Sequence, residues 1–578
     1  MSQLESINNI KDVKTVDNEN FDYLLAESNF RIESVFRSRN KGIIEPNVPI
    51  IGTTVAQDDL KVAPLQTNTK PGGTFEFIID ANDYTLFDLK DGEFDVQAQY
   101  AYKWEQASVN TPPYDVIPKF GNQCLLSLFQ KIELFIDGVS VEANLFPGLS
   151  SNAEYALRYP HNIKNEKEFE IHGFIKNEQP VIYNGGALQS TTDAHVKAVN
   201  KLWDNQAITF KAYDYSSDSN TKILYSGFIT QRIRLADIFS VVDTLPPLYN
   251  HKVMIRFTRA QHNNIICNTF LGLSDSDTSN VQCEFYGFQK FKLIQDTYIT
   301  TDQFIQTAKN YYSKPIETLI TQDKQIITPI INKPAANQVQ SFTIGIDAAY
   351  KNKLLTIAIP RSSDFSVQYN NLGDFVSSSK LVTNNTVAKQ HYDAYQNTAN
   401  SYTYGGLRYL SVHTNSGLLL YQFDVENDGV IQGAFGIFET TGYQTQCNYI
   451  NSNVKINNYQ DVYRQYVKSR LHFQQEEEEA LDFDTFMRDY CIFCIDLSCF
   501  ELSVNENIRI TMAFSDWGAK YNPYFQHNYE ETGHSQQSIN LICNLFCDKV
   551  LRLLPNRRIE LADLMTTNTV EVDNSNMA

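Results

Sequence analysis

Five cysteines in the C-terminal part of the chain come nearest to the spacing of a chemical site. They are Cys491, Cys494, Cys499, Cys543 and Cys547. Thiolates at short spacing are the usual ligands of a structural zinc ion. Cys491 and Cys494, however, belong to an apolar run typical of a strand, where residues three apart point to opposite faces. We therefore expect buried thiols that act as small hydrophobic side chains, with a zinc site as the less favoured alternative.

The histidines and glycines form no catalytic or phosphate-binding pattern. Among the ten histidines, His527 and His534 are the only close pair, seven apart in a polar loop, and the sequence contains no H-E-x-x-H motif. No G-x-x-x-x-G-K-[ST], G-x-S-x-G or G-x-G-x-x-G motif follows a predicted strand, so neither a phosphate cradle nor a nucleophile elbow is indicated. We expect a chain that is not an enzyme and has no catalytic, cofactor-binding or metal-binding residues.

A run of four carboxylates, Glu476 to Glu479, closes the clearest helical pattern of the sequence, which extends from Asn458 to Glu479. Tyr459 and Tyr463 recur there at helical spacing. The helix dipole disfavours negative charge at the C-terminal end of a helix. The run is therefore expected to be a solvated or frayed helix end, and a calcium or partner site is the alternative.

Length and charge indicate how many domains the chain forms and argue against some classes of protein. A chain of 578 residues exceeds what one hydrophobic core normally serves, so two large domains are expected. The 48 Lys and Arg against 67 Asp and Glu give a net charge of −19, which argues against sequence-specific nucleic-acid binding. Neither a signal peptide nor a transmembrane segment is predicted. Nine scattered cysteines indicate synthesis in a reducing cytoplasm.

The first half of the chain contains many short apolar patterns with the period of a β-strand. The sharpest signal is a hairpin within GNQCLLSLFQKIELFIDGVSVE (121–142), where Asp137-Gly138 suits a two-residue turn. Residues 145–220 are rich in Pro, Gly and Asn and are interpreted as a long loop. Further strands are expected at Phe75–Ile79, Phe94–Tyr102, Phe228–Leu235, Val253–Phe257 and Phe285–Tyr298, with a helical turn before Pro246-Pro247.

The second half repeats this plan. A polar insertion is expected at residues 361–405, and Asn415-Ser416-Gly417 suits the turn of a second hairpin. Strands are predicted at Ile316–Ile320, Phe342–Ile346, 354–360, 407–412, 418–425, Phe500–Val504 and Ile508–Phe514.

The two sets of strands predict an all-β fold with two tandem eight-stranded jelly rolls, a double jelly-roll, carrying long loop insertions and few short helices. Abundant Phe and Tyr, 36 and 33 residues, favour such sheets. The predicted division is an N-terminal arm at 1–44, a first jelly roll at 45–300, a second jelly roll at 301–560 and a flexible C-terminal tail at 561–578.

Several segments resemble, in order, landmarks of the double jelly-roll major capsid proteins of virophages and of Polinton (Maverick) elements. Residues 84–103, YTLFDLKDGEFDVQAQYAYK, resemble the early strand pair of that family, and residues 127–142, SLFQKIELFIDGVSVE, resemble its hairpin. Residues 145–160 take the place of a loop and helix that contain Pro and Tyr. Residues 227–260 resemble the strands that close the first jelly roll.

The resemblance implies a major capsid protein that forms homotrimers. Six jelly rolls of each trimer would make a pseudo-hexagonal capsomer, which tiles an icosahedral shell around double-stranded DNA together with neighbouring capsomers, penton and minor capsid proteins. The virion is then the expected location, after synthesis and assembly in the host cytoplasm. The basic residues Arg31, Arg37, Arg39 and Lys41 would touch packaged DNA or pair with a neighbour's acidic surface, and Arg557-Arg558 would serve similarly.

A β-sandwich carbohydrate-binding protein or glycosidase is the alternative from another class, because such proteins are also long, aromatic-rich and built from jelly rolls. A glycosidase needs two carboxylates about 5 to 10 Å apart in a cleft. Asp424 and Glu426 are a candidate pair, although such pairs are common in an acidic chain. A host-attachment spike would show fibrous repeats, and the sequence has none.

Overall fold

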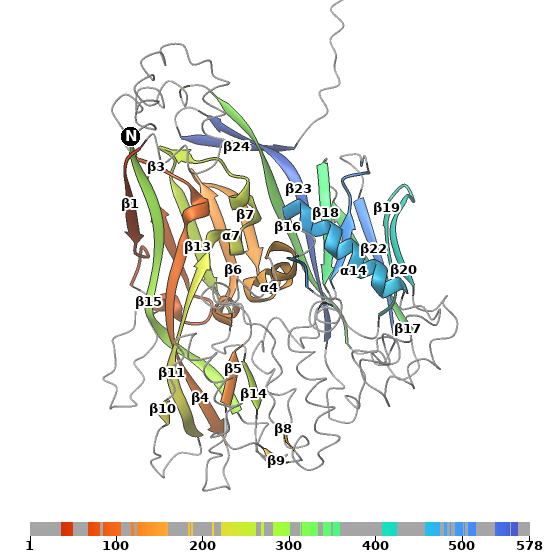
Figure 1. The fold of residues 1–578 in the computed structure, drawn as a ribbon, viewed down its shortest axis with the longest axis horizontal. Coiled ribbons are helices and arrows are strands. Elements are labelled where there is room, and N and C mark those ends of the chain that lie inside the picture. Colours follow the sequence, from red (N-terminus) through yellow and green to blue (C-terminus); the bar gives the residue numbers. More distant parts are fainter. Residues whose placement is uncertain are drawn as a thin grey trace, which may run out of the picture.

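The computed structural model shows two groups of antiparallel strands side by side, with short helices between and beside them (Figure 1). Within the described residues, no helix is long and apolar enough to cross a membrane. The structure describes residues 36–49, 67–80, 85–105, 117–120, 124–159, 183–184, 187–188, 211–212, 221–261, 267–270, 281–300, 313, 315–332, 339–347, 351–358, 407–424, 457–473, 479–481, 486, 492–500, 502, 507–515, 538–554 and 557–563.

Eight principal strands of the first half form two facing antiparallel sheets. They are β1 (Phe36–Ile44), β2 (Thr74–Ile79), β4 (Glu93–Glu105), β6 (Phe129–Ile136), β7 (Val139–Leu145), β11 (Thr221–Arg234), β13 (Val253–Arg259) and β15 (Val281–Thr300). One sheet has the order β1-β15-β4-β11 and the other the order β2-β13-β6-β7. Counted along the chain, these are strands 1-8-3-6 and 2-7-4-5, which is the arrangement of a jelly roll.

Short elements extend the first half. The short strands are β3 (Thr85–Phe87), β5 (Ile117–Phe120), β8 (Tyr183–Asn184), β9 (Ala187–Leu188), β10 (Lys211–Ala212), β12 (Leu248–Tyr249) and β14 (Cys267–Phe270). The helical elements are α4 (Pro147–Arg158), α7 (Leu235–Ile238) and the 3₁₀ turns η2 (Thr67–Thr69), η3 (Leu89–Asp91), η4 (Cys124–Leu128) and η6 (Ser240–Asp243). The turns α7 and η6 confirm the helical turn predicted before Pro246-Pro247.

The second half repeats the same strand order. Its strands are β16 (Ile316–Asn332), β17 (Val339–Asp347), β18 (Lys351–Ala358), β19 (Leu407–Thr414), β20 (Leu419–Asp424), β21 (Phe493–Asp496), β22 (Asn507–Ser515), β23 (Ser538–Leu554) and β24 (Arg558–Asp563), with α14 (Asn457–Ser469) and η8 (Arg470–Phe473). The sheets are β16-β23-β18-β21 and β17-β22-β19-β20, and β24 pairs with β23. The predicted double jelly-roll is therefore confirmed.

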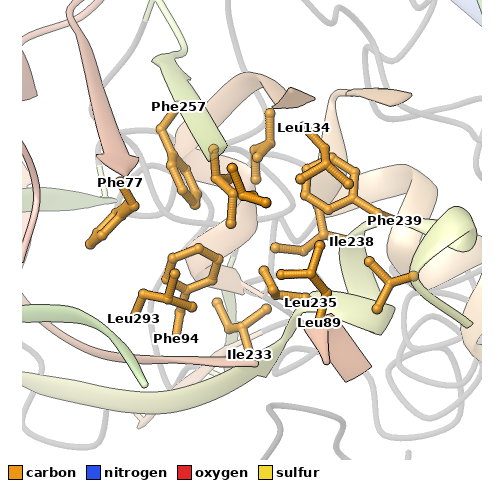
Figure 2. Packing of buried hydrophobic residues seen from close by; sticks show 14 of the residues in the cluster. Phe77, Leu89, Phe94, Leu134, Ile233, Leu235, Ile238, Phe239, Phe257 and Leu293 are labelled. Atoms are coloured by element: carbon orange, nitrogen blue, oxygen red, sulfur yellow. The ribbon is translucent and has the colours of Figure 1, made fainter. Parts of the chain in front are cut away.

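Aromatic side chains fill the core of the first jelly roll. Alternate residues of β2, β4 and β13 point inward, so Phe75, Phe77, Phe94 and Phe257 are each at most 1% exposed. The rings of Phe75 and Phe257 stack with centroids 5.2 Å apart. Figure 2 shows Phe77, Phe94 and Phe257 facing one interior space together with Leu235 from α7. This core ties both sheets to the short helix that leads toward the second half.

The predicted hairpin at Asp137-Gly138 is confirmed. Strands β6 and β7 pair directly up to Ile136 and Val139. The φ angles of Asp137 and Gly138 are 48° and 84°, and two positive values are the signature of a type I′ turn. The Asp137 carboxylate also accepts the backbone N–H of Lys252 at 2.8 Å. The turn is thereby fixed to the start of β13.

Two described strands overlap the predicted arm and tail. Residues 36–44 were expected in an N-terminal arm because they are polar, but they form β1, which pairs with β15 from Phe36 to Ile44. An edge strand tolerates such polar and charged residues because one of its sides faces no partner. At the other end, β24 continues to Asp563. The remaining domain limits stay predictions, and residues 1–35 and 564–578 lie outside the described residues.

Two elements of the second half were also predicted wrongly. The helix ends at Ser469, and the 3₁₀ turn η8 follows it, so the helix does not reach Glu479. Phe500 belongs to a turn and not to a strand, because its N–H donates to the carbonyl of Leu497 at 3.0 Å. The Asp496 side chain supports this turn by accepting the Ser498 N–H at 2.9 Å.

The helix α4 lies within the segment whose composition was interpreted as a loop at 145–220, at the place where the family resemblance implied a loop and helix at 145–160. The strand β23 was missed altogether. The long strand β23 gave no alternating signal because both of its faces are covered: from Leu541 to Phe546 no side chain is more than 2% exposed. In the sequence, a strand buried on both faces appears as a continuous run of apolar residues. Between Leu541 and Phe546 only Asn544 interrupts this run.

We expect Gly138→Ala to lower the free energy of unfolding by about 1–2 kcal/mol, because a Cβ is disfavoured at positive φ. Gly345→Ala is the matched control. Neither glycine has an atom within 4 Å of an added Cβ, but Gly345 lies in β17 without a positive φ. Urea unfolding of both variants checks this, and equal effects would contradict the type I′ turn as the cause.

Candidate functional site: the junction of the two jelly rolls

The described cysteines do not gather at one point. Cys494, Cys543 and Cys547 are buried, as expected for small hydrophobic side chains, whereas Cys499 is exposed. Cys494 lies on β21 and Cys543 on β23. Strand β18 lies between these two strands, which are therefore about 10 Å apart. Burial raises the pKa of the Cys543 thiol, so it stays protonated. Among the described residues, no group of three or more His, Cys, Asp or Glu could hold a metal ion.

The structure brings no other predicted site residues together. Cys491, His527, His534, Glu426 and residues 476–478 of the acidic run lie outside the described residues, so they remain untested. Glu479 lies beyond the end of α14. The backbones of Arg37, Arg39 and Lys41 belong to β1, and Arg557 donates to the Asn250 side chain at 2.9 Å.

A polar junction between the two halves, not predicted from the sequence, is the best-defined candidate site. It is built around α4, which follows β7 and lies against η4, β6 and η8, close to where the two groups of strands meet in Figure 1. Strand β16 of the second half contacts β7 and η6. Pro147 opens the helix at its first position, where a missing N–H costs nothing. Gly148 is required there, because a Cβ on it would lie 2.6 Å from the backbone of Ser127. The backbone thus places the next turns of α4 tightly against η4.

An ion pair on α4 is the centre of the junction. Arg158 Nε donates to Glu154 Oε2 at 2.7 Å, one helical turn away, and the two side chains are only 8% and 7% exposed. Arg158 Nη1 donates to the Ala236 carbonyl at 2.9 Å and to Asp243 Oδ2 at 3.0 Å, and Nη2 donates to the Ser240 hydroxyl. Although burial lowers its pKa, the neighbouring carboxylates raise the pKa of Arg158 above its ordinary value.

Glu142 on β7 fixes η6 beside this ion pair. Its two carboxylate oxygens accept the backbone N–H groups of Ser240 and Val241 at 2.8 and 2.7 Å. Burial raises the pKa of Glu142 to about 8, although both hydrogen bonds and the charge of Arg158 oppose the rise. A carboxylate at the start of a helical turn satisfies N–H groups that would otherwise have no partner.

Amide side chains of β16 join the second half to β7. Gln325 Oε1 accepts the Leu145 N–H at 2.6 Å, and Gln322 Nε2 donates to the Val141 carbonyl. From β23, Asn544 Nδ2 donates to Glu154 Oε1 at 2.9 Å. Side chains of the second half therefore replace strand pairing between the two jelly rolls, and they fix the relative position of β16 and β7.

The C-terminal end of α4 is capped from the second half by Tyr466 and Arg470. The Ala156 carbonyl accepts the Tyr466 hydroxyl at 2.9 Å and Arg470 Nη1 at 3.0 Å. Ala156 is among the last four residues of the helix, whose carbonyls have no partner within it. A guanidinium also complements the negative end of the helix dipole. Burial raises the pKa of Tyr466 to about 12, so its hydroxyl remains a donor.

One signal in the sequence could have located this site. Glu154 and Arg158 have the i,i+4 spacing of a helical ion pair, and Pro147 has the type expected at the first position of a helix. The partners on β7, β16 and β23 could not be found in this way, because they are separated from α4 by up to 390 positions along the chain.

We expect Arg158→Gln to lower the free energy of unfolding by about 3–5 kcal/mol, because it leaves Glu154 charged and buried without its ion-pair partner. The control is Arg464→Gln on α14. Arg464 pairs with Asp461 at 3.0 Å, but the two side chains are 70% and 60% exposed. Loss of this exposed ion pair should lower the free energy of unfolding by less than about 1 kcal/mol. Thermal unfolding of both variants distinguishes the two pairs, and similar losses would contradict a central role for Arg158.

We expect Tyr466→Phe to lower the free energy of unfolding by about 1–3 kcal/mol. The change removes the hydroxyl that donates to the Ala156 carbonyl at 2.9 Å and leaves the buried Leu481 N–H without the acceptor that it reaches at 3.1 Å. Tyr463→Phe is the control. It removes one partly buried hydrogen bond, 2.7 Å long, from the Tyr463 hydroxyl to the Leu481 carbonyl. Limited proteolysis of both variants should show faster cleavage only for Tyr466→Phe. Equal resistance would show that the cap on α4 does not hold the junction.

Comparison with known proteins shows similarity of fold without close similarity of sequence. No protein-family model and no curated protein matches the chain. A chain from the cryo-EM structure of the Sputnik virophage aligns over 94% of this chain and 91% of its own length, with 12% identity and a TM-score of 0.51. The mavirus major capsid protein aligns over 91% of this chain and 90% of its own, with 8% identity and a TM-score of 0.44. The predicted resemblance is therefore confirmed for the fold: this chain has the double jelly-roll fold found in the Sputnik virophage.

Proposed function

We propose that this chain is a major capsid protein. The observation that carries the proposal is the double jelly-roll itself: two jelly rolls of identical strand order lie side by side within one chain. The similarity in fold to a chain of the Sputnik virophage, over nearly the whole length of both, supports it. Within this proposal the chain has a structural role and is not an enzyme.

The proposed assembly is a homotrimer with a pseudo-hexagonal outline. Three copies of a chain with two similar halves present six jelly rolls around one axis, and three-fold closure satisfies head-to-tail contacts without open-ended growth. Such capsomers would tile an icosahedral shell around double-stranded DNA, with penton and minor capsid proteins at the remaining positions. The virion is the proposed location, and the host cytoplasm is the proposed place of synthesis.

The buried junction fits this role. A capsomer needs both jelly rolls at a fixed relative position, because each must contact its neighbours at the same point in every copy. The contacts of Gln325, Asn544 and Tyr466 with the first half supply that position within one chain. The net charge of −19 would keep free subunits apart from DNA and from one another before assembly.

Light scattering on the purified chain tests the proposal. We expect a mass of three copies of 66.1 kDa that persists on dilution, because an obligate interface buries more than about 2,000 Å². Negative-stain images of the same sample should show a hexagonal outline.

A monomer at every concentration, with a two-lobed outline, would contradict the capsomer. Sugar-binding and hydrolysis assays would then test the carbohydrate-active alternative.

A further inference from the structure

Asp323 on β16 is a buried carboxyl group that the architecture of the junction does not explain. Its side chain is 7% exposed, and its Oδ1 atom has no hydrogen-bond partner among the described residues. On the adjacent strand β23, Asn544 is 1% exposed, and its Oδ1 atom likewise has no partner there. A buried ionised carboxylate is normally surrounded by donors, because it has lost its hydration. Among the described residues, no donor reaches the Oδ1 atom of Asp323.

An acidic neighbour of Asp323 is Glu154 on α4. Asp323 pairs with Phe546 in the β16–β23 ladder, and Asn544, two residues from Phe546 on the same face of β23, donates to Glu154 at 2.9 Å. Two adjacent buried carboxylates repel each other, so they are stable side by side when they share one proton. Glu154 already accepts Arg158 Nε at 2.7 Å and Asn544 Nδ2 at 2.9 Å, one donor on each oxygen. Those donors favour the charged form of Glu154. The shared proton therefore belongs on Asp323, which donates it to Glu154.

The charges around this pair agree with that assignment. Arg158 is the cation that acts on Asp323, and it faces several carboxyl groups, so the group cannot be neutral if all of its acids are ionised. The groups around it are Glu154 on α4, Glu142 on β7, Asp323 on β16 and the uncharged Asn544 on β23, with Asp237 on α7 and Asp243 on η6 behind Arg158. A second guanidinium, that of Arg470 on η8, contacts α4 at the Ala156 carbonyl.

We propose that Asp323 and Glu154 form a proton-binding site between the two jelly rolls, and that release of this proton weakens the junction as the pH rises. The site goes beyond the proposed capsid function and does not depend on it, since both carboxyl groups belong to one chain. The proton acts as the ligand that joins β16 to α4. When it leaves, two negative charges face each other, and Arg158, which already pairs with Glu154, is the cation beside them.

The direction of the pH effect follows from the environment of Asp323. Burial first, and then the charges of Glu154 and Glu142, raise its pKa well above the ordinary value of 3.8. The folded chain therefore binds this proton more tightly than the unfolded chain. The free energy of unfolding must fall as the pH rises from the ordinary value toward the raised one. Burial raises the pKa of Glu142 and of Asp237 to about 8, so both add to the same trend.

The test is Asp323→Asn in the full chain, because an amide donates to Glu154 at every pH. We expect the melting temperature of the wild type to fall by at least about 2 °C relative to this variant between about pH 5 and about pH 9. Glu154→Gln removes the charge of the other partner and should remove the same pH-dependent difference. It also takes away the ion-pair partner of Arg158, so its pH dependence, and not its melting temperature at one pH, is compared. The double variant should remove no more than either single one, since one proton is shared.

Asp548→Asn is the matched control on the neighbouring strand. Asp548 is also buried, but it pairs with Lys353 at 2.8 Å, so its neutralisation should lower the melting temperature at alkaline pH. Asp323→Asn should have the opposite sign there. The proposal is overturned if Asp323→Asn keeps the wild-type pH dependence or is destabilised at alkaline pH as Asp548→Asn is.

A second readout requires no variant to fold. The infrared carbonyl band of a protonated carboxylic acid should be present in the wild type at neutral pH, where exposed carboxyl groups are ionised. Its absence would overturn the proposal.

Discussion

The rest of the structure depends on how charge is compensated where the two jelly rolls meet. Burying a polar surface without partners costs more than the apolar contacts around it return. Arg158 meets this constraint by contacting Glu154 on its own helix. It also contacts Ala236 on α7 and Ser240 and Asp243 on η6. With that guanidinium in place, β7 and β16 can bury their facing amide and carboxyl groups together.

The apolar cores extend across the same junction. The first core includes Ile320, Leu551 and Ile559 from the second half, and the second core includes Ala156 and Leu157 from α4. The two jelly rolls are therefore not separate domains joined by a linker. Each lends side chains to the core of the other, and the polar contacts around α4 determine their relative position.

The sequence predicted what depends on local patterning and missed what depends on contacts distant in the chain. The alternation of Phe75 and Phe77, and the Asp137-Gly138 turn, identified strands because one face of each strand is polar. That signal vanishes in β23, whose neighbours cover both faces. The Pro, Gly and Asn residues around α4 favoured a loop there, and only the family resemblance implied a helix within residues 145–160. The partners of its Glu154 lie on β16 and β23, so only the folded chain brings the site together.

A cryo-EM reconstruction of the purified full-length chain is the most direct test of the central claim, that two jelly rolls locked around α4 form one unit of a capsid. The account predicts a three-fold particle in which every copy shows α4 packed against η4, β6 and η8 and β16 against β7, with the side chain of Arg158 against Glu154. A reconstruction in which the two jelly rolls take variable relative positions, with α4 exposed to solvent, would contradict it.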